Sequence, residues 1–216
     1  MKVLITTPTQ DTKLDAYYVH SSNKSMELAR AHGHEVNAVY WPGEALVQHA
    51  RNALAQIAVH SGVDKIFMID ADQEWGPEQF LRIINNPCEV VGATYRRKTD
   101  EEQYTVRVTQ NFRLNGGIEQ VLCMGTGFLC VSREALKAVW DASEPYAHSD
   151  GQTYRNIFEV GVIDGKLYGE DTVFCEKLVQ AGFPVYLDST FTVGHNGYKR
   201  YKGNFRAYVE RLTVGV

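Results

Sequence analysis

The run Lys65–Ile69, followed at once by Asp70-Ala71-Asp72, constrains the fold of this chain more than any other stretch. A continuous apolar run of this length predicts a β-strand buried on both faces, as in the centre of a parallel sheet. Such a strand holds no charge inside, so the two aspartates mark its carboxyl end, where open α/β sheets bind ligands. Acids one residue apart can converge on one divalent cation. For an isolated pair of this kind, a turn that favours aspartate is the simpler explanation.

The first hundred residues alternate between strand-like and helix-like segments. This alternation predicts a parallel sheet with helical crossovers. The expected strands are Val3–Thr6, Glu35–Tyr40, Lys65–Ile69 and Glu89–Ala93, and the expected helices are Leu14–Ala31, Glu44–His60 and Pro77–Ile84.

The pattern changes after Tyr95. We expect a small hairpin, an irregular loop over residues 142–168 and a return to short strands and helices. The expected segments are a hairpin of Tyr104–Gln110 with Ile118–Cys123, a strand at Gly125–Val131, a helix from Ser132 to Trp140, a helix at Glu170–Ala181, strands at Phe183–Leu187 and Phe191–Val193, and a helix at Asn204–Leu212.

Length and composition favour a single domain over residues 1–216. The chain has 216 residues, of which 44% are hydrophobic, enough for one core. A net charge of -4 gives no overall attraction to nucleic acid or anionic membranes. We expect no transmembrane segment, because no apolar run is long enough. The four cysteines are scattered without a C-x-x-C pair, which argues against a zinc site and fits reduced thiols in the cytoplasm.

Several fragments, in order, resemble the nucleotide-sugar glycosyltransferases of the GT-A fold. They are MKVLITTPT, Arg51-Asn52, IDAD, GTGFLCVSREAL, YGEDTVFC, QAGFPVYLD and VGH. The part from Met1 to about Lys98 also resembles compact glycosyltransferases of bacteriophages. The resemblance implies an α/β, Rossmann-like mixed sheet flanked by helices, with a small β-hairpin and an acceptor-side C-terminal part. Residues from 1 to about 98 would form the nucleotide-sugar-binding half, and residues from about 99 to 216 the acceptor and catalytic half.

The resemblance assigns a divalent metal to Asp72 and His195, with Asp70 facing the ribose or a metal-bound water. Such an ion grips the diphosphate and stabilises the charge that develops as the sugar leaves. An imidazole ligand favours Mn²⁺ over Mg²⁺. The alternative for His195 is a histidine that simply packs beside Gly194.

The segment Gly169-Glu170-Asp171 opens a predicted helix, and capping alone explains two acids at a helix N-terminus. The resemblance gives Asp171 the position of the general base in sugar-inverting enzymes. Glu170 then positions the acceptor or serves as the alternative base. The stereochemical outcome stays open.

Nucleotide contacts are expected at the carboxyl end of the first strand, from Thr6, Thr7 and Pro8. The resemblance adds Arg51, whose alternative is a solvated helical arginine. A basic run after His195 includes Lys199, which we expect to close over the diphosphate.

Acceptor contacts are expected from two segments. Gly125, Thr126 and Gly127 permit close backbone approach to a ligand, or simply a tight strand entry. Tyr95, Arg97 and Lys98 belong to a basic cluster. On an acidic chain, basic patches near the site favour a polyanionic acceptor. One candidate is a hydroxymethylated pyrimidine in phage DNA, extruded from the duplex, which would place the protein in the host-cell cytoplasm.

Together with these patterns, the resemblance implies a metal-dependent hexosyl- or pentosyltransferase. It would move a sugar from a nucleoside-diphosphate sugar, UDP-sugar favoured, to a hydroxyl acceptor. The alternatives are a non-catalytic nucleotide- or carbohydrate-binding module on the same fold, or a glycosyltransferase with a cell-surface glycan or lipid acceptor. A nucleotidyltransferase is disfavoured, because no glycine-rich basic segment follows the first strand.

Overall fold

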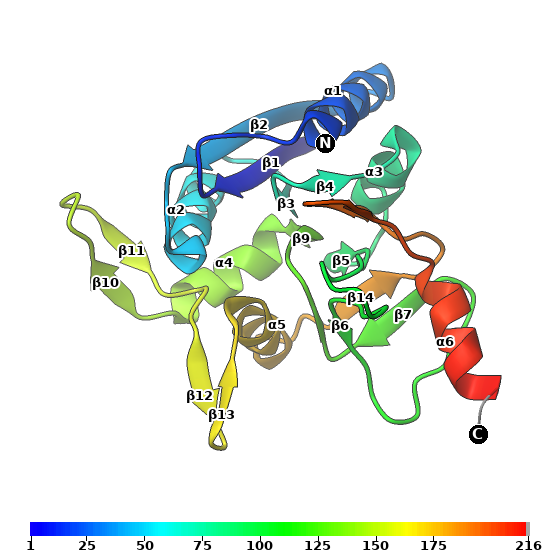
Figure 1. Ribbon diagram of the computed structural model, residues 1–216. Helices are drawn as coiled ribbons and strands as arrows, with labels where there is room; N and C mark the ends of the chain where they lie inside the picture. Colours follow the sequence, from blue (N-terminus) through cyan, green and yellow to red (C-terminus); the bar gives the residue numbers. More distant parts are fainter. Residues whose placement is uncertain (215–216) are drawn as a thin grey trace.

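A computed structural model describes residues 1–214, in which seven strands form one mixed sheet (Figure 1). The strand order is β2-β1-β3-β9-β5-β14-β7. These strands are β1 (Lys2–Thr9), β2 (Glu35–Pro42), β3 (Lys65–Ile69), β5 (Val90–Gly92), β7 (Ile118–Val121), β9 (Phe128–Ser132) and β14 (Val185–Asp188).

Strand directions make the sheet mixed, as predicted. β1 runs parallel to β2 and β3, and β14 runs parallel to β5. β9 lies between β3 and β5 and is antiparallel to both, while β7 is antiparallel to β14. β5 runs in the same direction as β3, as expected. It does not lie beside β3, however, because β9 is inserted between the two strands. An apolar run shows that a strand is buried but carries no information about its direction, and β9 is as apolar as β3.

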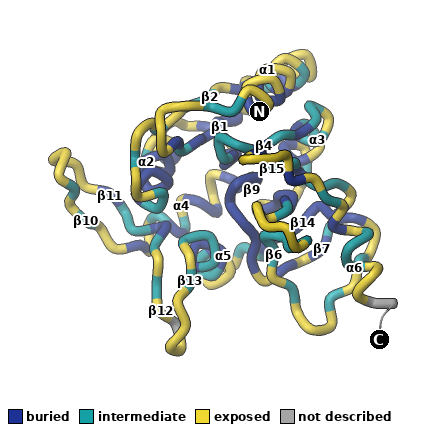
Figure 2. Tube along the Cα trace, in the orientation of Figure 1, coloured by how far each residue is buried: buried dark blue, intermediate teal, exposed yellow. Residues whose placement is uncertain are grey.

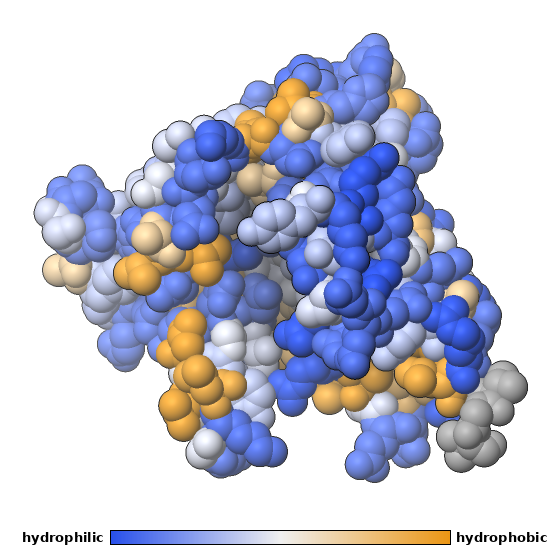
Figure 3. All heavy atoms as spheres, viewed as in Figure 1, coloured by the Kyte–Doolittle hydropathy of each residue, from blue (hydrophilic) through white to orange (hydrophobic). Residues whose placement is uncertain are grey.

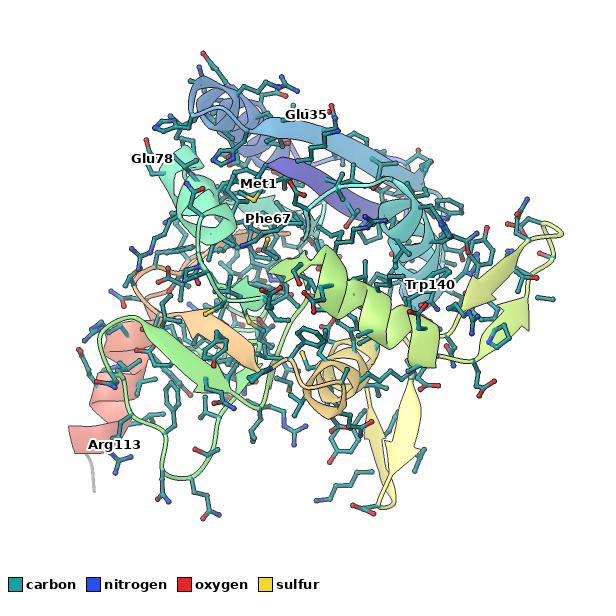
Figure 4. The ribbon with its side chains drawn as sticks, turned by 180° about the vertical axis from the view of Figure 1, so that it is seen from behind. Met1, Glu35, Phe67, Glu78, Arg113 and Trp140 are labelled. Atoms are coloured by element: carbon teal, nitrogen blue, oxygen red, sulfur yellow. The ribbon has the colours of Figure 1, made fainter. Side chains whose placement is uncertain are left out.

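Helices cover both faces of the sheet, which explains why β3 is continuously apolar. Ile66 and Met68 pack into one hydrophobic core, whereas Ile69 and Phe67, which is labelled in Figure 4, pack into the core on the opposite face. This two-residue alternation is the geometry of a strand. The first face is covered by α2 (Val47–His60), α4 (Arg133–Ala142) and α5 (Glu170–Gln180), and the second by α1 (Ala16–Ala31) and α3 (Pro77–Ile84).

Local sequence signals account for the helix starts. Asp15 precedes α1 and accepts the backbone N–H of Tyr17, and Ser132 accepts the N–H of Ala135 at the start of α4. Pro77 occupies the first position of α3. α5 begins after Gly169 with Glu170 and Asp171 in its first turn, where the helix dipole favours negative charge.

The segment 142–168 is not the irregular loop we expected. It forms two hairpins that project from the body, β10 (Pro145–Ala147) with β11 (Thr153–Arg155) and β12 (Gly161–Ile163) with β13 (Lys166–Tyr168) (Figures 1 and 2). Figure 3 shows hydrophobic side chains gathered on the second hairpin, where Val162 and Leu167 are exposed. These hairpins bury little apolar surface, so hydrophobic alternation could not reveal them.

Two other strand predictions are confirmed only in part. The expected hairpin of Tyr104–Gln110 with Ile118–Cys123 is reduced to a short antiparallel pair, in which β6 (Val106–Arg107) pairs with β8 (Cys123–Met124) and Arg107 lies opposite Cys123. The rest of the second segment forms β7, which joins the sheet edge beside β14. The predicted strand at Phe191–Val193 is reduced to a single bridge between Val193 and Tyr95. In each case a long-range partner, invisible to local patterns, decides the pairing.

A small sheet crosses the end of β3. Its strands are β4 (Gln73–Glu74), β15 (Gly194–Asn196) and β16 (Arg200–Tyr201). Register places His195 opposite Gln73. The last helix, α6 (Phe205–Val214), follows. None of the described helices has the length and apolar character needed to cross a membrane.

Candidate active site

Asp70 and Asp72, at the carboxyl end of β3, have different surroundings. The carboxylate of Asp70 accepts a 2.9 Å hydrogen bond from Arg51, which projects from α2 and is only 7% exposed. Glu170 of α5 lies 3.7 Å from the same guanidinium. Burial disfavours the charge of Arg51, but Asp70, Asp171 and Glu170 outweigh it and raise its pKa. Arg51 is therefore a buried cation that joins β3 to α5.

Asp72 faces the late histidine. The N–H of Asn196 donates to the carbonyl of Asp72 at 2.8 Å. This backbone bond brings Nε2 of His195 to 3.5 Å from Oδ1 of Asp72. Oδ2 of Asp72 is bound by Lys98 at 2.5 Å. Within the described chain, Oδ1 is buried and has no hydrogen-bond partner. Burial raises the pKa of Asp72, but His195 and Lys98 overcome it and hold the pKa below its ordinary value.

The tautomer of His195 supports metal binding. Nδ1 lies 2.9 Å from the carbonyl oxygen of Arg96, which can only accept, so Nδ1 carries the proton. Nε2 is then the ring nitrogen left to bind an ion, and it faces the carboxylate of Asp72. Ligand nitrogen and oxygen atoms lie about 2.0–2.2 Å from ions such as Zn²⁺, so one ion can contact two atoms 3.5 Å apart. Asp72 and His195 therefore fit a divalent metal, with the Arg96 carbonyl orienting the imidazole.

A pocket of about 720 Å³ opens beside these residues, and we call it the β1–β3 pocket. Its walls come from the ends of β1 and β3, from the loops that follow β1 and β2, and from the N-terminal part of α2. Wall residues include Pro8, Lys13, Asp15, Glu44, Arg51, Asp70 and Asp72. This is the carboxyl edge of the parallel strands, where the topology predicts a ligand.

A second pocket, of about 350 Å³, contains Asp171, and we call it the Asp171 pocket. The hydroxyl of Thr126 donates a short hydrogen bond to Asp171. Arg97 and Arg107 also line this pocket. Among the residues that the structure describes, neither guanidinium forms an ion pair with a carboxylate. Both guanidinium groups therefore line the pocket that contains the carboxylate of Asp171.

Gly125 and Gly127 are needed for packing. A Cβ atom at Gly127 would lie 2.6 Å from both Oδ2 of Asp70 and the hydroxyl of Tyr95, and one at Gly125 would lie 2.4 Å from that hydroxyl. Tyr95 is 4% exposed and accepts the N–H of Gly127 at 3.1 Å. Burial raises its pKa, and the charges of Asp70 and Asp171 add to the effect. Tyr95 therefore packs against residues 125–127, the segment that leads into β9.

Several predicted contacts lie elsewhere. Thr6 and Thr7 are buried, and Thr7 shares a 2.6 Å hydrogen bond with the hydroxyl of Tyr18, so only Pro8 of that group lines the β1–β3 pocket. Lys199 is exposed, pairs with Asp100 at 2.5 Å and lies outside both pocket walls. Lys98 contacts Asp72 rather than the Asp171 pocket.

Sequence patterns missed other wall residues. Lys13, Asp15 and Glu44 follow the carboxyl ends of β1 and β2, so the rule that located Asp70 could have found them. Arg107 and Thr172 had no such signal. They reach the Asp171 pocket through the β6–β8 pairing and the first turn of α5.

Comparisons with known proteins support the fold. No protein-family model matches the chain, and no curated protein matches it. Among solved structures, A197 from STIV is similar with a TM-score of 0.59 and 16% identity, covering 91% of this chain and 86% of that one. A glycosyltransferase involved in glycosylation of the major capsid of PBCV-1 aligns at a TM-score of 0.34 and 15% identity, covering 64% and 65%. The chain therefore has a mixed α/β fold like that of A197, with its sheet flanked by helices.

Proposed function

We propose that this protein is a metal-dependent glycosyltransferase that moves a sugar from a nucleoside-diphosphate sugar to a hydroxyl group. The observation that carries the proposal is the approach of Asp72 Oδ1 and His195 Nε2 to 3.5 Å at the edge of the β1–β3 pocket. A divalent ion held there supplies Lewis-acid stabilisation of the departing diphosphate. An imidazole and a carboxylate suit Mn²⁺, with Mg²⁺ as the alternative.

The β1–β3 pocket is assigned to the donor. Its volume of about 720 Å³ lies in the usual range for small-molecule sites. Arg51 and Asp70 line this pocket as a buried ion pair. Lys98 adds positive charge beside Asp72. We favour a UDP-sugar as donor, following the family resemblance.

Asp171 is assigned as the general base. Its carboxylate faces the second pocket and is oriented by Thr126. The acceptor oxygen forms a bond to the anomeric carbon, its proton passes to Asp171, and the carbon–oxygen bond to the diphosphate breaks with the electron pair on the phosphate oxygen. Attack opposite the leaving group inverts the configuration. Glu170, bound to Arg51, positions this end of α5.

The charges of the Asp171 pocket favour an anionic acceptor. Arg97 and Arg107 have no carboxylate partner in the described structure and can bind a phosphate or carboxylate near the reacting hydroxyl. DNA with hydroxymethylated pyrimidines meets this requirement if the base leaves the duplex to reach the pocket. Acidic glycans and phosphate-bearing lipids carry the same charge, so the acceptor screen includes them.

The test is a screen of nucleotide sugars for release of nucleoside diphosphate, with and without Mn²⁺ and with each acceptor class. We expect metal-dependent release. Asp72→Ala should abolish the response to metal, because a cation ligand is removed, whereas Asp171→Asn should retain donor binding and lose transfer. Full activity of Asp72→Ala would refute the metal assignment. Donor binding without turnover under any condition would instead support the non-catalytic binding module.

A further inference from the structure

Three potential metal ligands meet outside the proposed active site. Glu44 lies in the loop after β2, His49 in the first turn of α2 and His148 at the end of β10. One ring nitrogen of each histidine and a carboxylate oxygen of Glu44 all lie within 4.8 Å of one another. The proposed transfer reaction uses none of these side chains.

His49 has an unsatisfied nitrogen in a buried position. The residue is 5% exposed, and its Nδ1 lies 2.8 Å from the hydroxyl of Tyr146, which also accepts from Asn52 at 3.2 Å. Nε2 is buried and has no hydrogen-bond partner in the described part of the chain. Buried polar atoms are nearly always paired, so an unpaired one calls for an explanation. A bound ion at Nε2 supplies one.

His148 has a similar arrangement. Its ring stacks on that of His49, with centroids 3.9 Å apart and planes at 22°. Nδ1 of His148 lies 3.3 Å from a carboxylate oxygen of Asp150 but forms no hydrogen bond there, and among the described residues it is a second buried ring nitrogen without a partner. An unpaired buried nitrogen on each ring calls for the same explanation.

We propose that Glu44, His49 and His148 bind a Zn²⁺ ion. Two imidazoles and one carboxylate are a ligand set that suits Zn²⁺ and leaves a fourth position for water. They are less suited to Mg²⁺, which prefers oxygen ligands. Because the two rings are nearly parallel, the His148 ring must turn about its side-chain bonds to direct a nitrogen at an ion held by His49. The ion thus replaces the stacked contact.

The site would couple a hairpin to the β1–β3 pocket. Glu44 is part of the wall of that pocket, and His148 belongs to the projecting β10–β11 hairpin (Figure 1). An ion that binds both side chains would fix the pocket wall to the hairpin. It shares no ligand with the metal of the proposed reaction, which is assigned to Asp72 and His195.

The test uses the full chain carrying Asp72→Ala and His195→Ala, so that only the new site remains. After treatment with a chelator, the protein is titrated with Zn²⁺ by calorimetry and with Co²⁺ by visible absorption. We expect one ion per chain and the intense visible bands of low-coordinate Co²⁺. Adding His148→Ala or Glu44→Gln should weaken Zn²⁺ binding about tenfold or more. Loss of a direct ligand should reduce metal affinity at least as much as loss of an outer-shell partner does.

His20→Ala is the matched control, because His20 is exposed and distant from the cluster in the pocket beside α1. It should leave Zn²⁺ affinity unchanged. Glu44→Gln retains the shape of the side chain, so its effect does not depend on whether His148→Ala loosens the hairpin. The proposal would be overturned if the protein bound no stoichiometric Zn²⁺. It would also be overturned if the Glu44 and His148 variants bound Zn²⁺ as tightly as the parent protein that carries Asp72→Ala and His195→Ala.

Discussion

Nε2 of His195 and Oδ1 of Asp72 lie 3.5 Å apart because β15 pairs with β4 immediately after the β3 strand. The contact is fixed by backbone hydrogen bonding rather than by the two side chains alone. The two atoms are therefore held close together before any donor binds, and the metal binding that we propose would require the Lys98 contact with Asp72 to adjust.

We predict that His195→Ala weakens Mn²⁺ binding by on the order of 100-fold, since loss of a ligand should cost at least as much as loss of an outer-shell partner. The measurement is the dependence of nucleoside-diphosphate release on Mn²⁺ concentration. Saturating Mn²⁺ should restore part of the rate. His60→Ala serves as the control, because His60 is an exposed residue that packs against Trp140. An unchanged Mn²⁺ requirement in His195→Ala would show that His195 only packs beside Gly194.

Replacing Arg51 by methionine should destabilise the fold strongly. The change leaves Asp70 and Glu170 without their buried cation, and breaking a buried ion pair typically costs about 3–5 kcal/mol. Urea unfolding would measure the loss. The matched control is Arg206→Met, which removes an exposed helical pair with Glu210 and should cost about 1 kcal/mol or less. A small effect at Arg51 would mean that water compensates the two carboxylates.

Much of the fold could be predicted from the sequence because its signals are local. The apolar run of β3, the aspartates after it, Pro77 and Ser132 each act within a few residues, and the structure confirms the elements that they predict. Position within the sheet is different. Insertion of β9 between β3 and β5 depends on pairing between distant segments, which periodicity does not encode.

The site divides in the same way. Asp70 and Asp72 could be located because they end a buried strand, but the partner of each depends on tertiary structure. Arg51 forms an ion pair with Asp70, and the pairing of β15 with β4 places His195 beside Asp72. Thr7 shows the opposite error. It ends a strand as expected, yet its hydroxyl bonds to Tyr18 in the interior, and strand position alone does not reveal which way a side chain faces.

Glu170 should make stability depend on pH. Burial raises its pKa, the charge of Asp171 adds to the effect, and Arg51 compensates only in part. An acid whose pKa is higher in the folded state is neutral in both states at low pH, and the folded state loses stability as pH rises through the folded pKa. Glu170→Gln removes this loss, so the variant should unfold at a higher temperature than the wild type at pH 7 but not near pH 4.

Thermal unfolding at the two pH values checks the sign. Glu134→Gln is the matched control, because Glu134 is exposed in the first turn of α4, where loss of negative charge removes a favourable interaction with the helix dipole. That variant should be equal to or slightly less stable than the wild type at pH 7. Destabilisation by Glu170→Gln at pH 7 would mean that the 3.7 Å contact with Arg51 outweighs burial.

Arg107 should select for negative charge on the acceptor. It lines the Asp171 pocket with Arg97 and packs over the ring of Tyr168 at 5.2 Å. A hydrogen bond to a charged group contributes about 1.5–3 kcal/mol, so Arg107→Ala should raise the KM for an anionic acceptor by about 10- to 150-fold. Donor hydrolysis in the absence of acceptor should not change, because Arg107 does not line the β1–β3 pocket.

Arg113→Ala is the control for this change. Arg113, labelled in Figure 4, is exposed on the loop before β7 and does not line the Asp171 pocket. Acceptor kinetics at two ionic strengths test whether Arg107 acts on the acceptor through its charge. The wild-type KM should rise with salt, because screening weakens attraction between exposed charges, and the Arg107→Ala variant should respond less. An unchanged KM of the Arg107→Ala variant for every anionic acceptor would contradict this prediction. The pocket would then accept neutral hydroxyl compounds, and Arg107 would have only a structural role in the β6–β8 segment.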